Sequence, residues 1–122
     1  MDEPHTLPFS TFWSWIITHP NCILRAGTPE TVIYDDEDLH WHFAAEGPDT
    51  LVVQVLRGKR LLGELLLAPD QISHVEGQVA EEPGEYVFEL VSAADTDRIA
   101  AYFFVLTHGW DEESASTPTR VH

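Results

Sequence analysis

The chain has 122 residues, 43% of them hydrophobic, which is enough apolar material for one domain with a single core. Six Lys and Arg stand against 21 Asp and Glu, so the formal net charge is −15. A field of this sign repels phosphate backbones and anionic membrane surfaces, which excludes direct nucleic-acid and membrane-surface binding and favours a basic protein as partner.

The chain carries no sign of secretion or of a membrane span. Residues 1–5 are acidic, whereas a secretory signal begins with basic residues. The longest apolar run, residues 99–106, has eight residues, less than half of the roughly 20 that a spanning helix needs. Cys22 is the only cysteine, so no intrachain disulfide can form. We therefore expect a cytoplasmic protein.

A short helix is predicted near the N-terminus, after residues 1–8, which contain two prolines and no periodicity. Ser10 or Thr11 can serve as the N-cap. Pro20 disfavours helical geometry at the preceding residue, so the helix is expected to end near Thr18. Its apolar face carries residues at helical spacing, namely Phe12, Trp15, Ile16 and His19.

From Cys22 onward the period shortens to two, which predicts strands over residues 22–25, 31–34, 39–45, 51–56, 61–67, 72–79 and 86–91. We expect residues 72–79 to form a short edge strand and the acidic run Asp35–Asp38 to form a hairpin loop. Gly58-Lys59 suits a two-residue turn with glycine first. Residues 98–106 could be helix or strand, and their aromatic and β-branched composition favours a strand.

One helix followed by six or seven short strands predicts an α+β fold, with the N-terminal helix packed on a curved, mainly antiparallel sheet. The alternative is a β-sandwich or partial barrel with an appended helix. A single domain over residues 1–110 is expected, followed by a flexible acidic and polar tail over residues 111–122.

His40, His42 and Glu46 form the sharpest local motif. Alternate residues of a strand share a face, so both imidazoles could meet one divalent transition metal. The His-x-His-x3-Glu spacing is similar to the first metal motif of the cupin family, whose members are β-barrels. The resemblance implies a metal-dependent enzyme or sensor. The chain departs from that family at Tyr34, where cupins have glycine, and Pro83-Gly84 lacks the second-motif histidine.

The same segment has an explanation that needs no cofactor. If Leu39, Trp41 and Phe43 fill the core, the two histidines simply occupy the solvent face of a half-buried strand. Calcium binding by the acidic run Asp35–Asp38 is excluded, because the position of the required glycine in an EF-hand loop is occupied by Trp41. We expect no cofactor, with a transition metal as the alternative.

Catalytic motifs are lacking, because the sequence has neither a Gly-x-Ser-x-Gly elbow nor a glycine-rich phosphate loop. Cys22 and His19 lie three residues apart but are separated by Pro20, so they can pair only if this loop folds back. We expect Cys22 to be a buried, unreactive small hydrophobe. The sequence offers no catalytic residue and leans against an enzyme.

The charge is unevenly distributed along the chain. Residues 31–50 hold six acids and residues 71–90 hold five, and neither block contains a Lys or Arg. Half of all basic residues cluster at one predicted hairpin tip. The candidate binding surface therefore combines this tip with the acidic run, as Arg57, Lys59, Arg60, Asp35, Asp36, Glu37 and Asp38. The alternative is that basic side chains merely solvate the turn and protect sheet edges.

These features favour a non-enzymatic protein-binding or regulatory module that docks on a basic partner protein. A second copy is another possible partner, since the basic tip could bind acidic loops of a neighbour, giving a homo-oligomer. A third hypothesis is a nucleic-acid mimic, which requires the acids of residues 31–50 and 71–90 to line one face.

Overall fold

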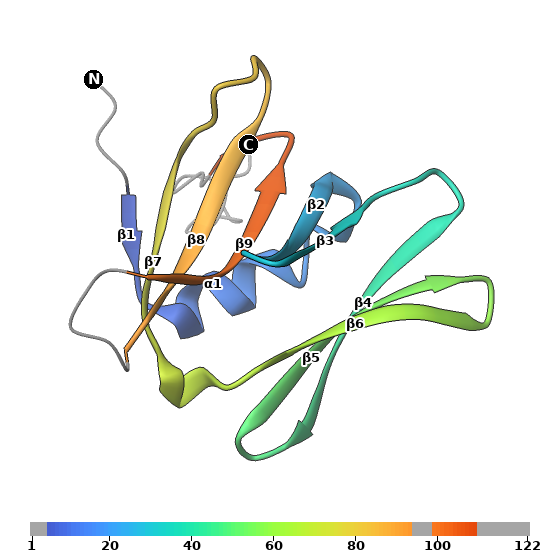
Figure 1. Ribbon diagram of the computed structural model, residues 1–122, viewed down its shortest axis with the longest axis horizontal. Helices are drawn as coiled ribbons and strands as arrows, with labels where there is room; N and C mark the ends of the chain where they lie inside the picture. The colour runs from blue at the N-terminus through green and yellow to red at the C-terminus, as the bar shows by residue number, and fades with distance from the viewer. Residues whose placement is uncertain (1–4, 94–98, 110–122) are drawn as a thin grey trace, which may run out of the picture.

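The computed structural model describes residues 5–93 and 99–109 (Figure 1). The described residues form one α-helix and nine strands, and the neighbouring strands pair antiparallel. In chain order these are β1 (His5–Leu7), α1 (Phe9–Ile16), β2 (Ile23–Thr28), β3 (Thr31–Tyr34), β4 (Leu39–Gly47), β5 (Thr50–Arg57), β6 (Arg60–Leu67), β7 (Ile72–Val79), β8 (Tyr86–Ser92) and β9 (Ala100–Leu106).

The strands divide into two open sheets. The large sheet has the order β1-β7-β8-β9-β2-β3, and the small sheet is the meander β4-β5-β6. Neither sheet closes into a barrel, and Figure 1 shows the small sheet projecting away from the large one at the lower right. The fold is α+β, as the sequence predicts. Among the described residues, no helix is long and apolar enough to cross a membrane.

The core lies where α1 covers one face of the large sheet. Phe12 is fully buried there, with its ring 5.1 Å from Phe88 and 5.7 Å from Phe104. The helix also reaches the small sheet, because the rings of Trp13 and Phe43 meet edge to face at 5.5 Å. Rings of this size dominate the burial that stabilises such a small domain.

Two contacts hold the sheets together away from the helix. The terminal methyl group of Ile33 in β3 packs over Gly63 of β6. The Tyr102 hydroxyl of β9 donates a hydrogen bond of 2.8 Å to the Leu66 carbonyl of β6. Burial of this phenol raises the pKa of Tyr102 above its ordinary value.

Most predicted strands are present, and residues 98–106 contain strand β9, as their composition favours. The two-residue turn is also confirmed: Arg57 pairs with Arg60, and Gly58 has a φ of +64°, which glycine adopts without strain. The predicted tail over residues 111–122 lies outside the described residues.

Several details of the predicted elements are wrong. Residues 5–7 form strand β1 because β7 offers them a partner. The helix begins at Phe9 after Pro8, with no side-chain cap, so neither Ser10 nor Thr11 is the N-cap. Strand β2 runs on through Gly27 to Thr28. The large sheet has six strands, as the sequence predicts, and three further strands form the separate small sheet.

Strand β7 is not an edge strand, because it lies between β1 and β8. Ile72 and Val75 are buried, whereas His74, Glu76 and Gln78 are partly exposed, as expected for an inner strand with one face toward the core.

The acidic run Asp35–Asp38 is not a hairpin loop, because it links the two sheets. Strand β3 pairs with β2, and β4 pairs with β5. The Leu39 amide donates to the Asp36 carbonyl at 2.9 Å, and this tight turn redirects the chain.

Candidate functional site

The two faces of the large sheet differ in chemistry. Phe88 of β8 and Phe104 of β9 point toward α1 and are fully buried. Because alternate residues of a strand project to opposite sides, Val87, Phe103 and Val105 lie on the other face. No helix covers this second face among the described residues.

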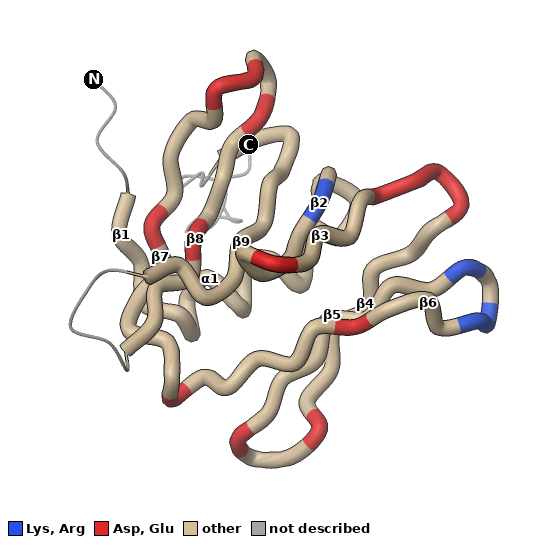
Figure 2. Tube along the Cα trace, viewed as in Figure 1, with Lys and Arg blue, Asp and Glu red and all other residues tan. Residues whose placement is uncertain are grey.

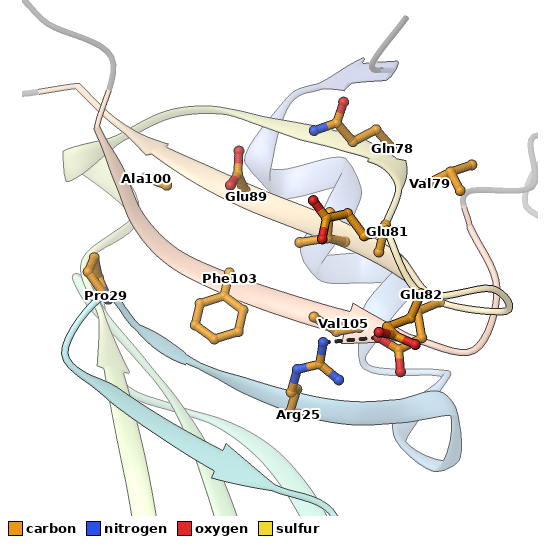
Figure 3. Close-up of a pocket in the computed structure, with 13 residues that line it drawn as sticks. Arg25, Pro29, Gln78, Val79, Glu81, Glu82, Glu89, Ala100, Phe103 and Val105 are labelled. Atoms are coloured by element: carbon orange, nitrogen blue, oxygen red, sulfur yellow. Dashed lines mark hydrogen bonds and ion pairs between the residues drawn. The ribbon is translucent and has the colours of Figure 1, made fainter. Parts of the chain in front are cut away.

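A hollow of about 710 Å³ lies on this uncovered face, within the volume range of ligand pockets. It extends over strands β2, β7, β8 and β9 and the turn between β7 and β8. Its lining comprises Arg25, Pro29, Gln78, Val79, Ala80, Glu81, Glu82, Glu85, Val87, Glu89, Ala100, Phe103 and Val105. Figure 3 shows Phe103 and Val105 of β9 between Glu89 of β8 and Arg25 of β2. We call this feature the acidic hollow.

A local turn places two of its carboxylates at the rim. The Glu85 amide donates to the Glu82 carbonyl at 3.2 Å, with Pro83 and Gly84 at the central positions. Gly84 has a φ of +81°, which matches the third residue of a type II β-turn. The Ala80 amide donates to the Glu85 carbonyl at 3.0 Å and closes the hairpin. Both Glu81 and Glu82 are exposed, so they are available to a ligand.

The charge of the acidic hollow is unbalanced. Four carboxylates and one guanidinium line it, which leaves a formal charge of minus three. Arg25 donates to Glu85 at 2.9 Å, with the two side chains 29% and 21% exposed, and the dashed line in Figure 3 marks this pair. Glu81 and Glu82 form no ion pair with Lys or Arg within residues 5–93 and 99–109. Arg25 therefore offsets only part of the formal negative charge of the described lining.

The predicted binding residues lie elsewhere, at one end of the small sheet. Leu39 pairs with Arg57, so the acidic run and the basic tip are adjacent, as Figure 2 shows by colour. No ion pair joins them in the described part of the chain. Asp35 accepts a hydrogen bond of 3.0 Å from the Trp41 indole, which gives it a structural role. Binding by this surface stays a prediction.

The predicted metal ligands all lie on β4. His40 and His42 are exposed while Trp41 is buried, which is the alternation of a half-buried strand. Glu46 is exposed near the other end of the same strand. Within the described ranges, no three His, Cys, Asp or Glu side chains are grouped so as to hold a metal ion. The metal hypothesis therefore stays a prediction that rests on the spacing.

The acids of residues 31–50 fall at both ends of β4, because the acidic run precedes that strand and Asp49 follows it. The nucleic-acid mimic requires them to line one face together with the acids of residues 71–90. This hypothesis also stays a prediction.

A second constellation escaped sequence reasoning. The Cys22 sulfur lies 3.1 Å from Nε2 of His108, 86 positions further along the chain. Cys22 is partly exposed, so the expectation of a buried thiol is wrong. Strands β2 and β9 bring the two residues together, since Ile23 pairs with Leu106 and the Thr107 amide donates to the Cys22 carbonyl at 3.0 Å. His19 is not the bonded partner, although its ring lies 5.4 Å from that of His108.

No family model, no curated protein and no solved structure matches this chain.

Proposed function

We propose that this protein is a non-enzymatic binding module whose acidic hollow takes a Lys- or Arg-bearing segment of a partner protein. The observation that carries the proposal is a carboxylate rim around an apolar floor, on the sheet face opposite α1. A regulatory role through such docking and a cytoplasmic location belong to the same proposal.

The rim selects for positive charge. Glu81 and Glu82 project from an exposed turn, and Arg25 neutralises one carboxylate of the lining at most. A cation that enters gains attraction from several carboxylates, whereas an anion meets repulsion from the same groups and from the net charge of −15. The expected ligand is therefore cationic.

The floor selects for a long side chain with an apolar stem. Val87, Phe103 and Val105 are hydrophobic, and each is at least partly shielded from solvent. Lys and Arg bury their methylene stems on such surfaces while the charged group reaches polar partners. A peptide segment with basic and apolar residues satisfies both the floor and the rim, which inorganic cations do not.

The test is a titration of the full chain with a labelled peptide that alternates lysine and leucine, followed by fluorescence anisotropy. The Glu81→Gln/Glu82→Gln variant removes two rim charges and is expected to weaken binding by about 1 kcal/mol, roughly fivefold. The matched control is Asp36→Asn/Glu37→Gln. It removes two negative charges from the acidic run, which is not part of the lining of the acidic hollow.

The salt dependence supplies a second readout. Raising salt from about 0.1 M to about 1 M shortens the Debye length from about 10 Å to about 3 Å, so binding should weaken strongly. The proposal fails if both double variants weaken binding equally, or if the affinity of the wild-type chain does not change with salt.

A further inference from the structure

The pair formed by Cys22 and His108 combines a nucleophile with a base. The sulfur and Nε2 are 3.1 Å apart, within reach of proton transfer between thiol and imidazole. The pair stands at the end of the β2–β9 ladder, just beyond the Ile23–Leu106 register pair. Because a backbone hydrogen bond of 3.0 Å from Thr107 to Cys22 continues the ladder, the sheet itself fixes this approach.

The hydrogen bonds of His108 select its tautomer. Nδ1 lies 3.0 Å from the Gly109 carbonyl oxygen, which can only accept. This network assigns the proton of the neutral ring to Nδ1 and leaves the lone pair of Nε2 directed at the thiol. The arrangement of nucleophile, base and a third group that orients the base is the general pattern of an activated nucleophile.

Aromatic neighbours hold the base in place. The His108 ring stands edge to face with Trp15 at 5.8 Å, and Trp15 is 5% exposed. His19 lies against the same indole at 4.6 Å, with its Nδ1 2.7 Å from the Trp15 carbonyl. The base therefore packs against Trp15 on the buried face of α1, while Cys22 and His108 themselves keep contact with solvent.

We infer that Cys22 is an activated thiol that exchanges with small disulfides and undergoes reversible S-thiolation. His108 Nε2 takes the thiol proton, and the Cys22 thiolate attacks one sulfur of a disulfide such as oxidised glutathione. The disulfide bond of the reagent breaks as the Cys22–S–S–R bond forms, and the leaving thiolate takes the electron pair and then the proton from His108. The inference is independent of ligand binding by the acidic hollow.

The first measurement is the rate at which the folded chain releases the coloured thiolate of an aromatic disulfide at neutral pH. The wild-type chain should react at least about tenfold faster than free glutathione, an exposed thiol without a base. His108→Gln should lose that advantage, Cys22→Ser should not react, and His42→Gln, an exposed histidine on β4, should react like the wild type. A wild-type rate no faster than that of glutathione would overturn the inference.

A pH profile separates the base from a merely structural contact. The rate of an unassisted thiol rises about tenfold per pH unit while it is mostly protonated, because only the thiolate attacks. The wild-type profile should be shallower, and His108→Gln should restore the steep one. His19 is the titratable neighbour, so His19→Gln is measured alongside and should keep the shallow profile. A steep wild-type profile contradicts the inference even if His108→Gln fails to fold.

The product is checked with oxidised glutathione. Intact mass spectrometry should show one glutathionyl group on the folded wild-type chain, and dithiothreitol should remove it. A chain that acquires no glutathionyl group while folded would refute S-thiolation at Cys22.

Discussion

The Arg25→Gln substitution distinguishes a cationic ligand from an anionic one. Arg25 is the only basic residue among the described residues that line the acidic hollow, and it forms an ion pair of 2.9 Å with Glu85. Its removal takes the formal charge of the lining from minus three to minus four and releases the Glu85 carboxylate for a ligand. A bound cation should therefore bind more tightly to the variant, although the variant lacks a native interaction.

The magnitude follows from the exposure of the pair. The two side chains are 29% and 21% exposed, so solvent still screens the interaction. Partly exposed ion pairs contribute about 0.2–1 kcal/mol, and a ligand cation that replaces Arg25 should gain a similar amount. The lysine–leucine peptide should then bind the variant about 1.5- to 5-fold more tightly. Stability should fall by no more than about 1 kcal/mol.

The assay compares anisotropy titrations of the wild type, Arg25→Gln and Arg57→Gln, with urea unfolding of each. Arg57→Gln makes the same change in net charge at the basic tip, so it measures the global electrostatic effect alone. A weaker affinity for Arg25→Gln than for Arg57→Gln would refute the reasoning, because it would mean that Arg25 itself contacts the ligand.

Three further substitutions test the fold. Phe12→Ala removes a fully buried ring from between α1 and the large sheet and should lower the free energy of unfolding by about 3–5 kcal/mol in urea titrations. Gly27→Ala would place a Cβ in steric conflict with the Thr31 carbonyl oxygen, so β3 must shift, and calorimetry should show a lower Tm and a cost of about 1–3 kcal/mol. Tyr102→Phe leaves the Leu66 carbonyl without its donor and should cost about 1 kcal/mol at neutral pH. Burial raises the pKa of Tyr102, so as pH rises the unfolded chain loses the phenol proton before the folded chain does. The contribution of Tyr102 to the free energy of unfolding is therefore complete below about pH 10 and is lost as pH rises through the folded-state pKa. At about pH 11, urea unfolding should therefore show a smaller difference in free energy of unfolding between the wild type and Tyr102→Phe than at neutral pH. An unchanged difference would contradict the raised pKa of Tyr102. Losses below about 1 kcal/mol for Phe12→Ala or Gly27→Ala would contradict the packing described for these two residues.

The sequence predicts the strands correctly where the alternation of apolar and polar residues and the flanking turn residues determine their bounds. The period-two pattern bounded by turn residues predicts residues 31–34 and 72–79 with the bounds that β3 and β7 have. Strand β1 carries no such signal, because its three residues are held by pairing with β7. The division into two sheets was equally hidden, since the turn chemistry of the acidic run suits a hairpin as well as a crossover.

The site was predictable only in part. Glu85, Val87 and Glu89 alternate in the sequence, so in an extended segment they share one face, with Val87 between two carboxylates. The acidic block over residues 71–90 is also visible in the sequence. Arg25 and Phe103 come from strands far away in sequence, and only the β8–β9–β2 order brings them to the same hollow. The contact between Cys22 and His108 depends on the same long-range pairing.

Amide NMR spectra of the isotope-labelled chain during titration with the lysine–leucine peptide test the central claim most directly. We expect the largest shifts at the turn over residues 80–85 and at the neighbouring hollow residues Val87, Glu89, Phe103 and Val105. Saturable shifts confined to the acidic run Asp35–Asp38, with the hollow residues unchanged, would contradict it.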